Sequence, residues 1–430
     1  MNNVDTIFAL SSGGGKSGVA VVRISGANLR PVADKMAGRA VTSRMAHLAN
    51  LRDDNNQLID QALILYFPAP HSFTGEDVIE IHCHGAPAVI RKIFDYLATQ
   101  NMRMATPGEF SRRAFDNNKM DLADVDGLAA LLDAQTDRQR QVALKSMTGG
   151  DGRVYDAWRG QMIEIAAYSA AILDYADDDL PPNIGARLRE RTQKLYDEIR
   201  TALSHYGAVR AVRGGFNIAL VGNPNVGKSS LFNRMVGANR AIVSDVPGTT
   251  RDVVTANLDI DGYMVNLSDT AGLRDTTDAV EKIGIERTYD EIENADLVLR
   301  VVTADDTEYK LADNEILVVN KSDLAGAARA DAIQISAKTG DGMDELMRAV
   351  RGRMHELMDG AESQLVVNAR THGLLCDAAN ALADAIDAGD NFDIVAENVR
   401  AASVAIGKIL GTISAADVMD ATFGQLCLGK

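Results

Sequence analysis

Short apolar runs separated by glycine and proline dominate the first 118 residues. The runs VAVVRIS, ALILYF and DVIEIHCHG have the length and the β-branched content that are typical of strands. The Gly- and Pro-containing stretches between them are typical of turns and loops. This pattern predicts an α/β or α+β domain at the start of the chain.

A helical pattern replaces the strands in two later regions. From Met120 to Gly149, and again after Leu365, the chain has few breakers and its apolar residues recur at helical spacing. The adjacent prolines of DDDLPPN, residues 177–183, predict a break between helices. The apolar positions expected in the core of the helical regions are Leu188, Leu195, Ile199, Leu203, Leu374, Leu375, Leu382 and Ile386.

Strand-like and helical segments alternate between Phe216 and about Arg353. This alternation is typical of a doubly wound α/β domain, in which helices cover both faces of a mostly parallel sheet. The sequence therefore predicts a multidomain α/β protein.

Composition narrows the class of protein. The 430 residues are 46% hydrophobic and 24% charged, which fits a soluble protein of two or three domains. The formal net charge of −16 excludes general binding to nucleic acid unless a local basic patch or a partner protein provides the contact. The three cysteines are too few and too widely spaced for a disulfide framework. The absence of a signal peptide pattern and of an apolar run of about 18 residues predicts a cytoplasmic protein without a membrane span.

A phosphate-binding loop is predicted within FNIALVGNPNVGKSSLFNRMVG, residues 216–237. Gly222, Gly227, Lys228 and Ser229 have the G-x-x-x-x-G-K-S spacing, between a strand and a helix. In such a loop the backbone N–H groups surround the phosphates, the lysine reaches the β and γ oxygens, and the serine binds Mg²⁺. The similar GGGKS at residues 13–17 has Leu10 in place of the first glycine, so it is predicted to be only a flexible loop.

Further motifs point to guanine as the base. In DTAG, residues 269–272, Asp269 can hold Mg²⁺ through water and the Gly272 N–H can meet the γ-phosphate. In NKSD, which supplies Asn320, Lys321 and Asp323, the aspartate can accept both the N1–H and the 2-amino group of guanine. The segment formed by Ser336, Ala337 and Lys338 can close over the base. The sequence predicts a GTPase, and a regulatory or ribosome-assembly GTPase switch is one class of protein that these motifs allow.

The nucleotide-binding motifs do not by themselves identify the residue that orients water for hydrolysis. Thr250, in IVSDVPGTTRD, is expected to complete the Mg²⁺ shell, and the loop is expected to act as a switch. The position just after D-x-x-G, where many small GTPases have a glutamine, is Leu273. Glu281 is the nearest acidic side chain that could orient water, and a solvated glutamate on a helix face is the alternative interpretation.

Five segments together resemble one family. These segments are DTAGLRDTTDAVEKIGIERT, GTTRD, GEDVIEIHCHG, RRAFDNNKMDL and the terminal CLGK. The chain closely resembles, over its whole length, the MnmE (TrmE) family of tRNA-modifying GTPases.

The resemblance implies an N-terminal α+β folate-binding and dimerisation domain over 1–118 and a discontinuous helical domain over 119–210 and 361–430. It also implies a Ras-like P-loop GTPase domain with a doubly wound sheet, inserted at 211–360.

The family's activity would be the addition of an aminomethyl-type (carboxymethylaminomethyl) group to carbon 5 of the wobble uridine in certain tRNAs. The resemblance implies a homodimer and an FAD-containing partner, MnmG (GidA). It also implies a tetrahydrofolate derivative, in the 5-formyl or 5,10-methylene form, as the source of the one-carbon unit.

The resemblance also assigns roles to individual residues. A potassium ion would be bound by Asn225 with Ser244, Val246 and Thr249, and Glu281 would be the catalytic acid that orients water indirectly. Val226 and Ser230 join the nucleotide-binding set of the loop.

For folate, the matching positions are Arg23, Glu80, Lys119 and Lys430, and Cys427 would act in tRNA modification. A folate-binding protein that is regulated by GTP and does no chemistry of its own is a further alternative. Asn118 stands where the family has glycine, and because asparagine tolerates left-handed backbone geometry the turn is expected to survive.

Overall fold

A computed structural model describes residues 5–174, 183–242, 254–269, 294–305, 310–324, 331–361, 364–365 and 367–411. Two compact units are distinguished by their internal contacts. The first contains the described residues of 1–129, 146–160 and 403–430, and the second contains those of 130–145 and 161–402. Among the described residues no helix is long and apolar enough to cross a membrane.

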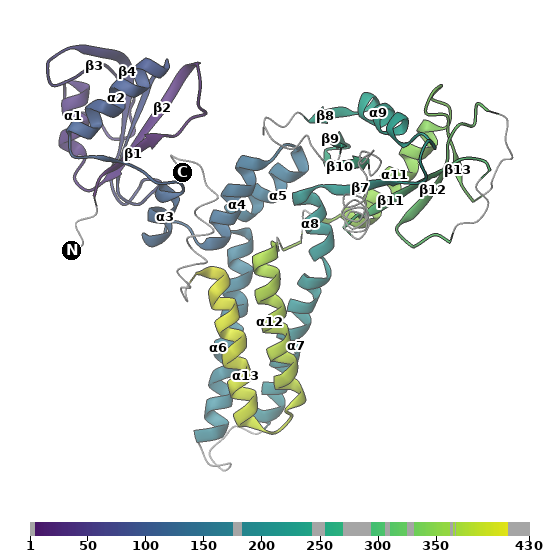
Figure 1. The fold of residues 1–430 in the computed structure, drawn as a ribbon. Coiled ribbons are helices and arrows are strands. Elements are labelled where there is room, and N and C mark those ends of the chain that lie inside the picture. Colours follow the sequence, from purple (N-terminus) through teal and green to yellow (C-terminus); the bar gives the residue numbers. More distant parts are fainter. Residues whose placement is uncertain are drawn as a thin grey trace, which may run out of the picture. The chain divides into compact units, whose positions relative to one another are not determined.

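A six-stranded sheet forms the centre of the first unit (Figure 1). Its strands lie in the order β3-β4-β5-β2-β1-β6, and all neighbours are antiparallel except β1 and β6. The strands are β1 (Ile7–Leu10), β2 (Ser17–Gly26), β3 (His47–Arg52), β4 (Leu58–Phe67), β5 (Asp77–Gly85) and β6 (Arg103–Met104). The three runs predicted as strands correspond to β2, β4 and β5, so these predictions are confirmed.

Helices pack on both faces of this sheet. Helices α1 (Arg30–Ala37) and α2 (Pro87–Thr99) contact the face that carries Val22, Ile64 and Ile81. Helix α3 (Glu109–Asp116) places Phe110 against Ile7 and Ala9, whose side chains point to the opposite face. Just after α3, Asn118 has a φ of 55°, which confirms the left-handed turn expected there.

The second unit contains a seven-stranded sheet in the order β13-β12-β11-β7-β10-β9-β8. Strands β7, β10, β11, β12 and β13 pair in parallel, whereas β9 is antiparallel to both β10 and β8. The strands are β7 (Phe216–Val221), β8 (Arg240–Ile242), β9 (Val254–Ile260), β10 (Tyr263–Asp269), β11 (Leu297–Val302), β12 (Glu315–Val319) and β13 (Ile333–Gln334). Residues of α8 (Tyr206–Gly214), α9 (Lys228–Ala238) and α11 (Met343–Met358) share its main apolar core. The doubly wound pattern is confirmed.

Long helices account for the segments between and after these sheets (Figure 1). They are α4 (Leu122–Asp133), α5 (Asp137–Met147), α6 (Gly150–Asp174), α7 (Ile184–Ser204), α12 (Ala369–Asp387) and α13 (Phe392–Leu410). Helices α7 and α12 contact each other along their length. Of the predicted core positions, Leu188, Leu195, Ile199, Leu375 and Leu382 are fully buried, and Leu203, Leu374 and Ile386 are partly buried.

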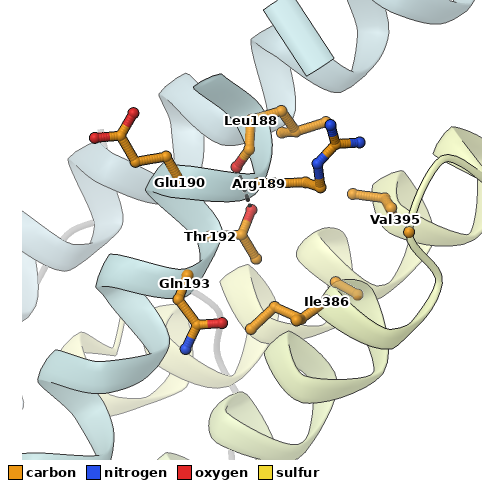
Figure 2. Close-up of a pocket in the computed structure, with 9 residues that line it drawn as sticks. Leu188, Arg189, Glu190, Thr192, Gln193, Ile386 and Val395 are labelled. Atoms are coloured by element: carbon orange, nitrogen blue, oxygen red, sulfur yellow. Dashed lines mark hydrogen bonds between the residues drawn. The ribbon is translucent and has the colours of Figure 1, made fainter. Parts of the chain in front are cut away.

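A small cavity of about 300 Å³ lies between α7 and the turn that joins α12 to α13 (Figure 2). Leu188, Ile386 and Val395 give it an apolar lining. The Thr192 hydroxyl donates to the Leu188 carbonyl oxygen at 2.8 Å, as the dashed line in Figure 2 shows, so its polar atom is satisfied within the helix. The cavity shares no residue with the predicted nucleotide site.

Candidate nucleotide-binding site

The predicted phosphate-binding loop connects the buried strand β7 to helix α9. Gly222 has no room for a side chain, because a Cβ there would lie 2.0 Å from the Val301 carbonyl oxygen. Gly227, with a φ of 99°, lies close to Asn320, whose Nδ2 would be 2.3 Å from a Cβ. Both glycines are thus required by close approach, and the loop places backbone N–H groups at the N-terminus of α9.

Lys228 closes this loop. Its ammonium donates to the carbonyl oxygens of Gly222 at 2.6 Å and of Asn223 at 3.1 Å. Only 6% of the residue is exposed. The positive charge is therefore held over the loop, where the phosphates of a nucleotide would lie.

Ser229 and Asp269 meet at the end of strand β10. The Ser229 hydroxyl donates to Asp269 Oδ2 at 2.7 Å, and Asp269 is 3% exposed. They are brought together because β10 pairs in parallel with β7, with Asp269 opposite Leu220. Hydroxyl and carboxylate oxygens are ligands that suit Mg²⁺, so this pair fits the role predicted for it.

Asn320 ties the loop to the segment predicted to bind the base. Its Nδ2 donates to the Val226 carbonyl oxygen at 2.9 Å, and its Oδ1 accepts from the N–H of Ala337 at 3.0 Å. The neighbouring Lys321 donates its ammonium to the Asn225 carbonyl oxygen at 2.7 Å. These hydrogen bonds from side chains to backbone atoms connect the predicted phosphate end of the site to its predicted base end.

Asp323 is held by Ser336, whose hydroxyl donates to Asp323 Oδ1 at 2.7 Å. This hydrogen bond, and more weakly the charges of Lys338 and Lys321, hold the pKa of the exposed Asp323 carboxyl below its usual range. The group is therefore ionised at neutral pH. An ionised carboxylate is an acceptor at both oxygens, as recognition of two adjacent guanine N–H groups requires.

Arg234 is a residue of the site that the motifs did not reveal. It lies on α9, and its guanidinium donates to the carbonyl oxygens of Ala337 at 2.7 Å and Lys338 at 2.6 Å. An arginine in a helix has no signal of its own in the sequence, since its partners lie about a hundred residues further along the chain. Only the fold brings them together.

The remaining predicted residues divide into two groups. Asn225, with a φ of 64°, and Val226 lie in the loop, and Ser230 is exposed in the first turn of α9. The residues that lie outside the described parts of the chain are Ser244, Val246, Thr249, Thr250, Gly272, Glu281, Cys427 and Lys430.

In the first unit, Arg23 and Glu80 form an ion pair across strands β2 and β5. The guanidinium donates to Glu80 Oε1 from Nη2 at 2.9 Å and from Nε at 3.1 Å. It also lies 5.0 Å from the ring centroid of Phe73. His82 Nε2 is 3.3 Å from the other carboxylate oxygen of Glu80. Acidic, basic and aromatic groups are thus combined on one partly buried surface.

Lys119 contacts the loop that carries Phe73. Its ammonium donates to the Pro70 carbonyl oxygen at 3.0 Å, and its side chain passes Gly75, where a Cβ would be 3.3 Å from Lys119 Cγ. The loop of residues 70–75 connects Lys119 to the Arg23–Glu80 pair.

Two family models match the chain and together cover most of it. The model described as GTP-binding protein TrmE N-terminus matches residues 6–119. The model described as MnmE helical domain matches residues 122–427.

Full-length relatives are similar to the chain throughout. The tRNA modification GTPase MnmE of Parvibaculum lavamentivorans is 41% identical over 99% of this chain and 100% of its own length. The protein of the same name from Agrobacterium fabrum is 40% identical over 100% of both chains. A solved structure, the G domain of the FeoB iron transporter of T. maritima, is 28% identical over 33% of this chain and 98% of that one, with a TM-score of 0.26, which carries no weight for the fold. From the family models and the full-length relatives it follows that the chain belongs to the MnmE family of tRNA modification GTPases.

Proposed function

We propose that the chain binds GTP at the edge of the seven-stranded sheet and hydrolyses it in a potassium-dependent reaction. The observation that carries this proposal is the position of four groups at one edge. Lys228 and the Ser229–Asp269 pair lie at the phosphate end, and Asp323 lies at the base end, with Asn320 between them. Ligands of open α/β sheets bind at this carboxyl edge of the strands.

The residues present fit a magnesium ion. Ser229 Oγ and the Asp269 carboxylate would hold it, one directly and one through water, and Thr250 would complete its shell. Bound there, the ion would neutralise charge on the β and γ phosphates.

The potassium site would begin at Asn225, whose side chain offers an amide oxygen at a left-handed turn of the loop. Ser244, Val246 and Thr249 would provide further oxygens. A monovalent cation in this place supplies positive charge between the β and γ phosphates, where other GTPases use an arginine. Glu281 would then orient the attacking water indirectly, without contacting it.

Hydrolysis is expected to be at least about tenfold faster in potassium chloride than in sodium chloride at matched ionic strength. This expected acceleration is smaller than the ~10³-fold rate increase that an arginine finger provides. The measurement is phosphate release by the full chain at saturating GTP. Asn225→Ala should lose most of the difference between the two salts.

The matched control is Asn233→Ala, which removes an exposed asparagine from α9. It should retain the full preference for potassium. Equal rates for the unaltered chain in both salts would overturn the cation mechanism while leaving GTP hydrolysis in place.

We propose further that hydrolysis is coupled to installing a carboxymethylaminomethyl-type group at carbon 5 of the tRNA wobble uridine. The chain would act in the cytoplasm as a homodimer, together with the FAD-containing partner MnmG. Membership of the family supports this. The Arg23–Glu80 pair beside Phe73 offers hydrogen-bonding and stacking groups that fit the pterin of a tetrahydrofolate derivative, while Lys119 and Lys430 would meet its acidic tail. Cys427 would serve the modification step.

Complementation tests the reaction on tRNA. In a bacterial strain that lacks its own protein of this family, the chain is expected to restore the modified wobble nucleoside, measured by mass spectrometry of digested tRNA. The same strain with an empty vector is the control. Unmodified uridine in spite of measurable GTP hydrolysis would favour a GTPase that acts only as a binding switch.

A further inference from the structure

We infer that Arg234 is a positioning residue for base recognition, which sets the orientation of the segment formed by Ser336, Ala337 and Lys338. This inference rests on the proposed binding of GTP and deepens it. It concerns how the site recognises the oxygen at position 6 of guanine.

The guanidinium of Arg234 donates hydrogen bonds to two successive peptide carbonyls. Its Nε donates to the Ala337 oxygen at 2.7 Å and its Nη2 to the Lys338 oxygen at 2.6 Å. Arginine presents its donors in a rigid planar fork, so a two-point contact of this kind fixes direction as well as distance. The helix that begins at the phosphates thereby holds the segment expected at the base.

The chain makes space for this contact at Gly340. A Cβ at that position would lie 2.9 Å from Arg234 Nη1, and the φ of +100° is one that glycine adopts readily. The turn is closed by its own hydrogen bonds, from the N–H of Gly340 to the Ser336 oxygen at 2.8 Å and from the N–H of Ser336 to the Asp341 oxygen at 2.9 Å. The guanidinium therefore docks on a preformed turn.

Peptide planarity links these hydrogen bonds to the base. In a trans peptide the C=O and the following N–H point in opposite directions. Because Arg234 draws the Ala337 carbonyl towards α9, the N–H of Lys338 must point away from α9. The N–H of Ala337 is already donated to Asn320 Oδ1 at 3.0 Å, so the position of this donor is fixed as well.

A backbone N–H held in a fixed position, such as that of Lys338, can distinguish guanine from bases that have a 6-amino group. Guanine has an acceptor, O6, at the ring position next to the N1–H that Asp323 is expected to bind, whereas a 6-amino group is a donor. The Ser336 hydroxyl joins its segment to Asp323, which keeps the two reading groups side by side. We therefore assign the reading of position 6 to the backbone that Arg234 holds, and the reading of position 2 to Asp323.

Base analogues separate these two roles. Affinities of the full chain are measured by calorimetry for GDP, for 6-thioguanosine diphosphate and for inosine diphosphate. The 6-thio analogue keeps N1–H and the 2-amino group but has a weakly accepting sulfur at position 6, and inosine diphosphate lacks only the 2-amino group. Arg234→Ala is expected to weaken GDP binding about tenfold and to reduce the preference for GDP over the 6-thio analogue by a similar factor, which is the size of one hydrogen bond between the backbone and the base. The preference for GDP over inosine diphosphate should be unchanged. Arg234→Lys should recover part of the loss.

The ratio of two affinities within one variant does not depend on how much of the sample is folded, so a loss of stability cannot imitate the result. Arg353→Ala is the matched control. Arg353 lies on α11 and, like Arg234, donates to a backbone carbonyl oxygen, that of Asp313 at 3.0 Å. This control variant should keep both ratios. If Arg234→Ala keeps the preference for GDP over the 6-thio analogue, the inference is wrong. If the unaltered chain fails to bind GDP, the proposed function itself is wrong.

Discussion

Replacing Asp323 with asparagine is expected to reverse the base preference of the site from guanine to xanthine. The carboxylate of Asp323 can accept from both N1–H and the 2-amino group of guanine, whereas an asparagine amide offers one acceptor and one donor. The donor would face the 2-amino group of guanine but would match the oxygen at position 2 of xanthine. Affinity for GTP should fall by about 10³-fold or more, because a site built for a hydrogen bond rejects a mismatched partner strongly.

The local structure should survive this change, since an asparagine Oδ1 can still accept the hydrogen bond from Ser336 that Asp323 accepts now at 2.7 Å. Competition binding with GDP and xanthosine diphosphate measures the effect. Asp344→Asn, which makes the same replacement at an exposed position in the first turn of α11, should leave both affinities unchanged. A variant of Asp323 that still preferred guanine would show that another group reads position 2.

Parts of the site were predictable because their signals are local. The glycine and lysine spacing of the phosphate loop, the strand before it and the helix after it are contiguous in sequence, and the structure places them as expected. The same holds for Asn118, whose left-handed backbone follows from the preference of one residue type. In these cases the preference of a single residue, or the spacing of neighbouring residues, was enough to predict the local structure.

Contacts between distant segments could not be predicted in this way. The family resemblance assigned Arg23 and Glu80 to folate binding, but their ion pair depends on the register in which β2 pairs with β5. The role of Arg234 depends on how α9 packs beside the turn after β13. Neither the register nor the packing has a signature within a short window, because both are set by the burial of many apolar side chains at once.

Replacing Lys228 with methionine is expected to lower kcat/KM for GTP hydrolysis by about 10²- to 10⁴-fold. The ammonium contacts the oxygens of Gly222 and Asn223 in the loop, and by the proposed function it would meet the β and γ phosphates. A hydrogen bond to a charged group contributes about 1.5–3 kcal/mol, so losing the interactions with two phosphates accounts for a change of this size. Methionine is unbranched and one atom shorter than lysine, so an apolar stem can remain buried in the same place.

Both kcat and KM should change, because the charge binds the ground state and also stabilises the negative charge that moves onto the leaving group. The comparison that isolates the site is Lys194→Met, which removes an ammonium whose side chain is 71% exposed on α7. That variant should hydrolyse GTP at the unaltered rate. If Lys228→Met raised KM alone and left kcat intact, the lysine would act only in binding, and the transition-state charge would have to be met by the proposed potassium and magnesium ions.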